Sequence, residues 1–280
     1  MPSVNDFGQS LGLPNQGGLF GRNQADTSWV ELAKVTTGNQ LEWVQAPRVR
    51  RVDFTRQADP ILVADAGGGA ATGVAGDINL MVMPNLAWNY HIKGTQTILG
   101  PALTTTGLNI SMDQTDDDGV ELRPSILGKS DFRFVVGTDK AFFFEVKLKI
   151  ADASGTDDLR IGFRKFEADQ ANVDDYDEMA CIGIGASLNI EIETILNAAA
   201  TTTTDTTNNS ADGETRVFRV NVSAAGVVTY LLDGVAPTTT AAFTFDNAEV
   251  VIPFIFFLHS ADVAGDVEII HLECGHQTST

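Results

Sequence analysis

The sequence predicts an all-β fold, an antiparallel β-sandwich that follows an extended N-terminal arm. From about residue 77 onward, apolar and polar residues alternate with a period of two, which is typical of strands with one face on a core and one in water. Turn signals such as Asp233–Gly234 separate these alternating runs. No alternation of strands with long helices is visible, so an α/β fold is excluded and a sandwich is favoured.

The clearest predicted strand is residues 142–150, FFFEVKLKI, and the runs at 108–113, 159–164, 188–193 and 216–222 repeat its alternation. The run VVIPFIFFL is apolar on both faces and predicts a central strand, in which Pro253 indicates a bulge or an edge. We expect these side chains to be mostly buried: Phe144, Val146, Leu148, Ile161, Phe163, Phe218, Val220, Val228, Tyr230, Phe254 and Phe256.

Residues 1–75 are interpreted as the extended arm, and residues 76–280 as the sandwich domain. The first 40 residues are rich in Gly, Asn, Gln and Pro, and GGGAATG at 67–73 indicates a flexible boundary. Isolated apolar residues, above all Trp29, Leu41 and Trp43, predict docking by separate anchors, because large aromatic side chains are costly to leave in water. The alternative is a tail without fixed contacts.

A local basic patch follows, formed by Arg48, Arg50, Arg51 and Arg56. In a chain of net charge −19 this patch is interpreted as a docking surface that contacts an acidic partner. The alternative is a strand edge whose solvated charges prevent edge-to-edge pairing.

The acidic balance, with a pI of about 4.4, argues against nucleic acid as a main partner, since phosphate binding needs a basic face. No apolar stretch approaches the roughly 20 residues of a spanning helix, and the N-terminus lacks the pattern of a signal peptide. We therefore expect folding in a cytoplasm and no membrane contact. The two cysteines, Cys181 and Cys274, are expected to be buried free thiols, although one bridge between neighbouring strands is the alternative.

Few residues of the sequence suggest a metal site or a catalytic site. The acidic runs Asp116–Asp118 and Asp174 to Glu178 could supply oxygen ligands for calcium, but neither has an EF-hand spacing. The weak metal candidates are Asp174, Asp175, Asp177 and Glu178. None of the four histidines has a recognisable nucleophile beside it, so we expect no catalytic residues and no cofactor.

The order of segments in the second half resembles a known family. The blocks IGFRK, DDYDEMA, IEIETILN, TTTTDTT, ADGETRVFRVNVSAAGVVTYLLDG and VVIPFIFFLHS are similar to virion proteins of tailed phages, including cyanophages and marine phages. That family's domain is similar to the concanavalin-like jelly roll. The match runs from about residue 103 to 275 and leaves the first 100 residues unmatched.

The resemblance implies a capsid decoration or cement protein on the exterior of the virion, assembled in the host cytoplasm. The implied partners are the major capsid protein and other copies of the chain, with a trimer expected. The alternative is a lectin-like carbohydrate-binding module of a tail fibre or spike, which usually displays aromatic rings; after residue 100 this chain has no Trp and two Tyr.

Enzymes of the concanavalin-like fold are the third class. They carry Glu-x-Asp-x-x-Glu on one strand, whereas this chain has Glu191 and Glu193 followed by Leu196 at the last position. We therefore interpret Glu191 and Glu193 as solvated charges on an outer sheet face, and we expect no enzyme activity.

Overall fold

The computed structural model describes residues 18–22, 29–35, 41–43, 49–53, 62–64, 71–72, 78–83, 86–94, 97–103, 106–112, 115–124, 133–260 and 267–277. Side chains are described at 88, 91–94, 106–110, 115–124, 133–260 and 267–277. The chain divides into two compact units, Met1–Arg48 and Val49–Thr280.

The smaller unit contains an antiparallel sheet of three strands, β1 (Gly18–Arg22), β2 (Trp29–Val35) and β3 (Leu41–Trp43), in that order. Trp29 begins β2, and Leu41 and Trp43 bound β3. The described part of this segment is therefore strand, where the sequence predicted an extended arm with isolated anchors.

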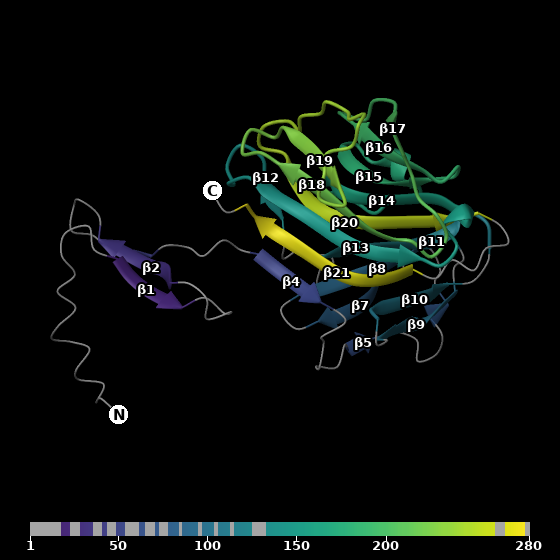
Figure 1. Ribbon diagram of the computed structural model, residues 1–280, viewed down its shortest axis with the longest axis horizontal. Helices are drawn as coiled ribbons and strands as arrows, with labels where there is room; N and C mark the ends of the chain where they lie inside the picture. Colours follow the sequence, from purple (N-terminus) through teal and green to yellow (C-terminus); the bar gives the residue numbers. More distant parts are fainter. Residues whose placement is uncertain are drawn as a thin grey trace. The chain divides into compact units, whose positions relative to one another are not determined.

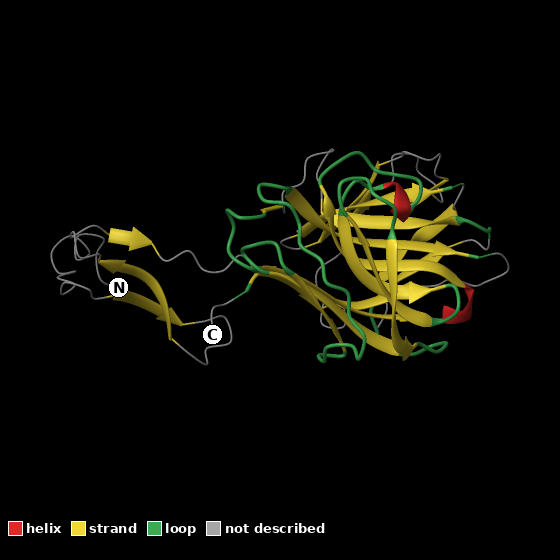
Figure 2. Cartoon of the chain, turned by 90° about the horizontal axis from the view of Figure 1, so that it is seen from above, coloured by secondary structure: helices red, strands yellow, loops and turns green. Residues whose placement is uncertain are grey.

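The larger unit is a sandwich of two antiparallel sheets (Figures 1 and 2). The eight-stranded sheet has the order β19 (Val228–Leu232), β18 (Thr215–Val222), β13 (Phe142–Ile150), β21 (Val267–His276), β10 (Leu108–Met112), β9 (Thr97–Leu103) and β6 (Ala71–Thr72), and β4 (Val49–Asp53) also pairs with β21. The ten-stranded sheet has the order β17 (Thr202–Asn209), β16 (Asn189–Ile195), β15 (Met179–Gly185), β14 (Thr156–Lys165), β20 (Val250–His259), β11 (Asp118–Pro124), β8 (Leu86–Lys93), β7 (Ile78–Met83) and β5 (Leu62–Ala64), and β12 (Phe134–Val135) also pairs with β20.

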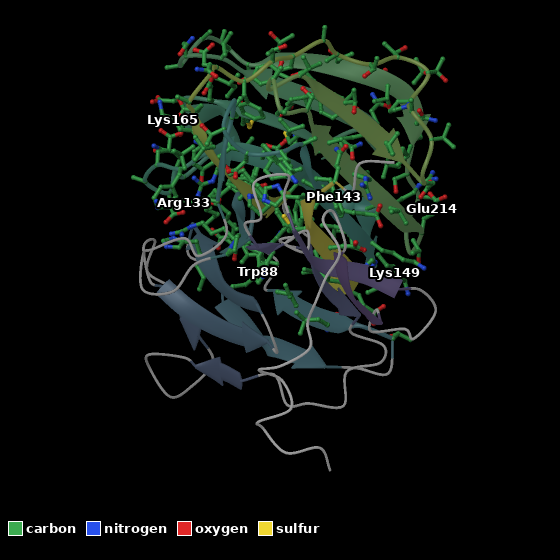
Figure 3. The ribbon with its side chains drawn as sticks, turned by 90° about the vertical axis from the view of Figure 1, so that its left-hand side faces the viewer. Trp88, Arg133, Phe143, Lys149, Lys165 and Glu214 are labelled. Atoms are coloured by element: carbon green, nitrogen blue, oxygen red, sulfur yellow. The ribbon has the colours of Figure 1, made fainter. Side chains whose placement is uncertain are left out.

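The core between the sheets consists of the apolar side chains of the predicted alternating runs. The strand β13 buries Phe144, Val146 and Leu148, while Glu145 and Lys147 on its other face are half-buried. Phe163 of β14 meets the rings of Phe142 and Phe144 edge to face, with centroids 5.0 and 6.3 Å apart. All of the side chains that the sequence predicted to be buried are buried, which confirms that prediction. In Figure 3 Lys165 of β14 and Lys149 of β13 lie on opposite flanks of the sandwich.

Of the two alternatives predicted at Pro253, the bulge is wrong, and the edge is present locally on one side of the strand. The strand β20 is central, as expected, but Pro253 pairs with Phe163 of β14 without a shift of register. On the other side of β20, β11 pairs with residues 255–259 and β12 with residues 250–251. Pro253 falls between these two stretches, so the donor that proline lacks interrupts no pair there.

The boundary of the larger unit lies at residue 49 rather than 76, because β4, β5 and β6 pair with strands of the sandwich. Helical structure in the described residues is limited to single 3₁₀ turns such as Ala153–Gly155 and Val173–Asp175 (Figure 2). None of the helices found there has the length and apolar character needed to cross a bilayer.

Candidate functional site

Charged side chains gather on the outer face of the ten-stranded sheet, the face turned away from the core. In β14 Leu159, Ile161 and Phe163 point inward, so the period of two turns Arg160 and Arg164 outward. In β16 Ile190 and Ile192 point inward in the same way, and Glu191 and Glu193 lie on the outer face. These charges are supported by rigid central strands rather than by loops.

A loop covers the apolar middle of this outer face. Residues 166–178 connect β14 to β15, and their side chains Val173 and Tyr176 form a second buried cluster on β20. The Tyr176 ring meets Phe254 with centroids 6.2 Å apart. The other members of this cluster are Met179, Cys181, Ile195, Phe256 and Leu258. The loop therefore seals a strip of sheet that would otherwise expose aromatic side chains to water.

A buried ion network holds the loop in place; we call it the clamp, formed by Lys93, Glu121, Arg164 and Tyr176. Glu121 accepts hydrogen bonds from Arg164 Nε at 2.7 Å, Lys93 Nζ at 2.8 Å and the Tyr176 hydroxyl at 2.6 Å. The Arg164 guanidinium also stacks on the Tyr176 ring, 4.2 Å from its centroid. Burial alone would raise the pKa of Glu121, but Arg164 and Lys93 outweigh it and lower that pKa to about 2.

Asp169 in the same loop extends the clamp toward β8 and β11. It accepts both hydrogen bonds of a fork from Arg123, each at 2.6 Å, and a third from Arg164 at 2.9 Å. His91 Nε2 lies 3.1 Å from the Asp169 carboxylate, and burial lowers the pKa of His91 despite that neighbour. The loop is thus tied to three strands by charge-assisted hydrogen bonds.

The other half of the outer face is acidic and partly open; we call it the acidic strip. It consists of Asp157, Asp158, Asp174, Glu191, Glu193 and Asp205, and Arg160 lies among them. Nη2 of Arg160 contacts Asp158 at 2.7 Å, Glu193 at 2.6 Å and Glu191 at 3.3 Å.

Arg160 reaches from β14 to β16 across β15 because the residue opposite it in β15 is Gly183. A Cβ at Gly183 would lie 1.6 Å from the Leu159 carbonyl oxygen, so the position accepts no side chain.

Burial raises the pKa of Asp158 to about 6; Arg160 opposes that rise, and Glu193, Asp157 and Asp174 add to it. Burial also raises the pKa of Glu191, with Glu193 and Asp205 contributing in the same direction. One guanidinium therefore leaves the negative charge of the strip incompletely balanced. Two buried polar atoms of the strip, Arg160 Nε and Glu193 Oε2, have no hydrogen-bond partner.

Glu178 lies at the other end of the covering loop and is buried. One of its oxygens accepts a hydrogen bond from the Asp246 amide at 3.4 Å, and the other has no partner. Burial, with Glu249 and Asp246 nearby, raises the pKa of Glu178 to about 7. This carboxyl therefore holds its proton through much of the weakly acidic range.

The structure does not gather the weak metal candidates into a site. Glu178 is buried and Asp177 half-buried, and Asp174 and Asp175 are exposed in the 3₁₀ turn. Across the residues whose side chains are described, no three His, Cys, Asp or Glu side chains are placed to hold a metal ion. Cys181 and Cys274 are buried free thiols, as predicted.

The docking residues stay a prediction. The structure places Trp29 in β2, Leu41 and Trp43 in β3, and Arg50 and Arg51 in β4, without describing their side chains. Arg50 and Arg51 are opposite Cys274 and Glu273 of β21, so their backbone belongs to the sandwich rather than to an arm. Arg48 and Arg56 lie outside the described residues.

One interpretation of the sequence is wrong. Glu193 was expected to be solvated, but it is buried against Arg160. Glu191 does retain partial exposure, with 18% of its side chain accessible. Both carboxylates converge on the same guanidinium nitrogen, an arrangement typical of an ion-pair network and unlike two carboxylates placed on either side of a sugar.

The two antiparallel sheets and the core between them define the chain as a β-sandwich. A protein of unknown function from Shewanella oneidensis MR-1 is similar at 12% identity and a TM-score of 0.48, over 85% of this chain and 91% of that one. The carbohydrate recognition domain of Emp46p, in its potassium-bound form, is similar at 8% identity and a TM-score of 0.48, over 68% and 89%. An alginate lyase from Pseudomonas aeruginosa follows at 12% identity and 0.43, over 62% and 84%.

No protein family profile matches the chain, and no curated protein matches its sequence. At these identities and TM-scores the likeness to solved structures extends to the sandwich and no further.

Proposed function

We propose that this chain is a carbohydrate-binding module that uses the outer face of its ten-stranded sheet and catalyses no reaction. The observation that carries the proposal is the acidic strip, where carboxylates on rigid strands keep unpaired acceptor capacity at a partly exposed surface. Asp158 has 28% of its side chain accessible and Glu191 has 18%. Carboxylate oxygens accept hydrogen bonds from sugar hydroxyls, and strands fix them more firmly than loops would.

The mode of binding would be polar. Among the described side chains, the exposed large hydrophobic residues are Leu196, Val227 and Val235, and no aromatic ring is among them. A sugar would therefore be held by hydrogen bonds that its hydroxyls donate to the carboxylates of the strip, and by the threonine hydroxyls beside it, such as that of Thr203, which donates to Glu193 at 3.4 Å. We expect weak binding by a single module, which several copies in one assembly would strengthen.

A glycan array probed with the labelled full chain tests the proposal. We expect a subset of glycans to bind, and the double variant Asp158→Asn, Glu191→Gln to lose that binding. The matched control is Glu145→Gln, which removes a half-buried carboxylate from the eight-stranded sheet. If the double variant binds glycans as well as the control does, the binding site lies outside the acidic strip. If neither the wild type nor either variant binds any glycan, a carbohydrate-binding function is refuted.

A second candidate is a structural protein of a phage virion, a capsid decoration protein, on the strength of the sequence blocks between residues 103 and 275. Co-sedimentation of the purified chain with capsids, and its copy number in purified virions, test this role. Hundreds of copies would support the shell, and absence from virions would refute it.

A further inference from the structure

Two buried glutamates help to hold the loop 166–178, and their surroundings differ. Glu121 of the clamp is paired with Arg164 and Lys93, whose positive charges balance its own. Glu178, the last residue of the loop, is 1% exposed and forms no ion pair among the described side chains. A carboxyl that is buried without a counterion is more stable in its neutral form. The contact at the clamp therefore depends on a charge, and the contact at Glu178 depends on a proton.

The groups that face Glu178 come from three segments and are mostly acidic. Asp246 and Glu249 lie in the turn before β20, and Asp177 precedes Glu178 in the loop. Lys165 at the end of β14 is the basic group, and its Nζ pairs with Asp177 at 3.5 Å and with Glu249 at 3.8 Å. Glu178 itself accepts one hydrogen bond at 3.4 Å, from the Asp246 amide, and its second oxygen has no partner. The contacts thus favour the neutral carboxyl, in agreement with a pKa that burial raises to about 7.

Glu178 lies where the loop meets two other turns of the sandwich; we call this place the junction, formed by residues 177–178, 197–198 and 246–249. The Ala198 amide donates to the Asp177 carbonyl at 2.7 Å, and the Asn197 side chain donates to the Asp246 carboxylate at 3.1 Å. Ala198 and Ala248 have φ angles of 53° and 69°, in the left-handed region that residues with a Cβ rarely adopt. Such conformations persist only where surrounding contacts impose them.

The junction also borders the apolar cluster that the loop covers. Met179 follows Glu178 and Ile195 precedes the 197–198 turn, and both side chains belong to this cluster. Contacts within the junction therefore contribute to the seal over the outer face of the sheet.

We propose that the junction is a pH-sensitive latch, in which the proton on Glu178 keeps the three segments together and its loss favours local opening while the clamp stays closed. Below about pH 4.5 the carboxyl is protonated in the closed and the open junction alike. Between that value and about pH 7 only the open junction ionises, so opening becomes easier as the pH rises. Above about pH 7 both forms are ionised and the effect is constant. The latch does not depend on carbohydrate binding.

Amide hydrogen exchange, followed residue by residue by NMR on the full chain, tests the latch. The wild type is compared with Glu178→Gln, which keeps the shape of the protonated carboxyl and cannot ionise. The ratio of the two exchange rates at one pH cancels the intrinsic effect of pH on exchange. For the Ala198 and Ala248 amides we expect this ratio to rise about tenfold or more from pH 5 to pH 8, with most of the rise below pH 7.

Two other amides show whether the opening is local. The Gln170 amide, which donates to the Tyr176 hydroxyl in the part of the loop held by the clamp, should have a ratio that does not change with pH. After correction for intrinsic rates, the Val146 amide in the centre of β13 should exchange more slowly than the amides of Ala198 and Ala248, since its exchange needs unfolding of the sandwich.

Two neighbouring variants test the assignment to Glu178. Glu249→Gln removes a charge that raises the pKa of Glu178, so the ratio should level off at a lower pH; Lys165→Gln removes a charge that lowers this pKa, so it should level off at a higher pH. Each variant is compared with the same protein carrying Glu178→Gln. Glu145→Gln, on the other sheet, is the control that should leave the profile unchanged.

Three results would overturn the latch. A ratio at Ala198 and Ala248 that is constant with pH would show that the proton on Glu178 does not hold the junction. Exchange of these amides no faster than that of Val146 would show that only unfolding of the sandwich releases the charge. An equal rise at Gln170 would show that the whole loop leaves the sheet together with the clamp.

Discussion

Glu121→Gln should destabilise the protein strongly and in a pH-dependent way. Glu121 is fully buried and its pKa is lowered from 4.5 to about 2, chiefly because Arg164 and Lys93 outweigh the effect of burial. A difference of this size between the folded and unfolded states corresponds to about 3 kcal/mol of stability at pH 7. Glutamine also removes the counterion of the buried Lys93 and one of the two carboxylates that Arg164 contacts, the other being Asp169, and breaking a buried pair in this way costs about 3–5 kcal/mol.

The sign of the pH dependence follows from the direction of the shift. A carboxyl with a lowered pKa in the folded state contributes stability above its unfolded value of 4.5, and that contribution is lost as the pH falls toward about 2. The wild type loses this contribution on acidification and the glutamine variant has none to lose. The difference in the free energy of unfolding between the wild type and the variant should therefore decrease by about 2 kcal/mol from pH 6 to pH 3.

Urea unfolding followed by tryptophan fluorescence, at intervals from pH 6 to pH 3, measures this difference in the free energy of unfolding. Glu145→Gln is the matched control, because Glu145 pairs with Arg219 at 3.1 Å in a half-buried setting, where ion pairs contribute about 0–1 kcal/mol. A Glu121 variant that unfolds like this control at pH 6, or a difference that stays constant with pH, would refute the view that the clamp is a stabilising ion network.

Three further predictions concern other parts of the chain. Phe163→Ala should cost about 3–5 kcal/mol in the same urea assay, because the ring is fully buried among Phe134, Phe142 and Phe144; a cost below about 1 kcal/mol would contradict that packing. Glu178→Gln should raise stability by about 1–3 kcal/mol at pH 8 and by little at pH 4.5, because a pKa raised from 4.5 to about 7 lowers stability progressively as the pH rises between these two values, and the whole penalty is present above them; an equal effect at both pH values would show that its charge is not the cause. Deleting residues 1–60 should abolish attachment to capsids if the anchors Trp29, Leu41 and Trp43 dock the protein; unchanged occupancy would refute that role, and because this deletion also removes β4, a shorter deletion of residues 1–48 should be compared with it.

The sequence was a good guide to the core and a poor one to the outer face. A period of two depends only on neighbours along the chain, so FFFEVKLKI and DLRIGFRK were enough to predict which side chains point inward. The same alternation placed Arg160 and Arg164 outward, and two arginines four residues apart on one strand were a visible signal. Their partners could not be found in this way, because Glu121 and Glu193 lie in strands whose order in the sheet is set by non-local pairing.

Glu193 illustrates the physical reason for the remaining errors. A glutamate that alternates with isoleucine is normally solvated, and only the reach of Arg160 over Gly183 buries this one. The burial of the loop 166–178 could not be predicted for the same reason. It depends on the hydrogen bond from Tyr176 to Glu121, which lies on a strand 55 residues earlier in the chain. At Pro253 the sequence could not decide between a bulge and an edge, because the gap between β11 and β12 that makes the local edge is a property of the assembled sheet.

The position of the last two strands in the order of the chain has a consequence for how the protein folds. The strand β20 lies between β14 and β11 in one sheet, and β21 lies between β13 and β10 in the other (Figure 1). Until residues 250–276 are present, each sheet is therefore two separate fragments and one unpaired strand, β12 in the larger sheet and β4 in the smaller, with open edges that expose unpaired backbone groups. Such a topology closes its longest loops last, so we expect slow folding that begins after synthesis of the sandwich is nearly finished, with aggregation as the competing process.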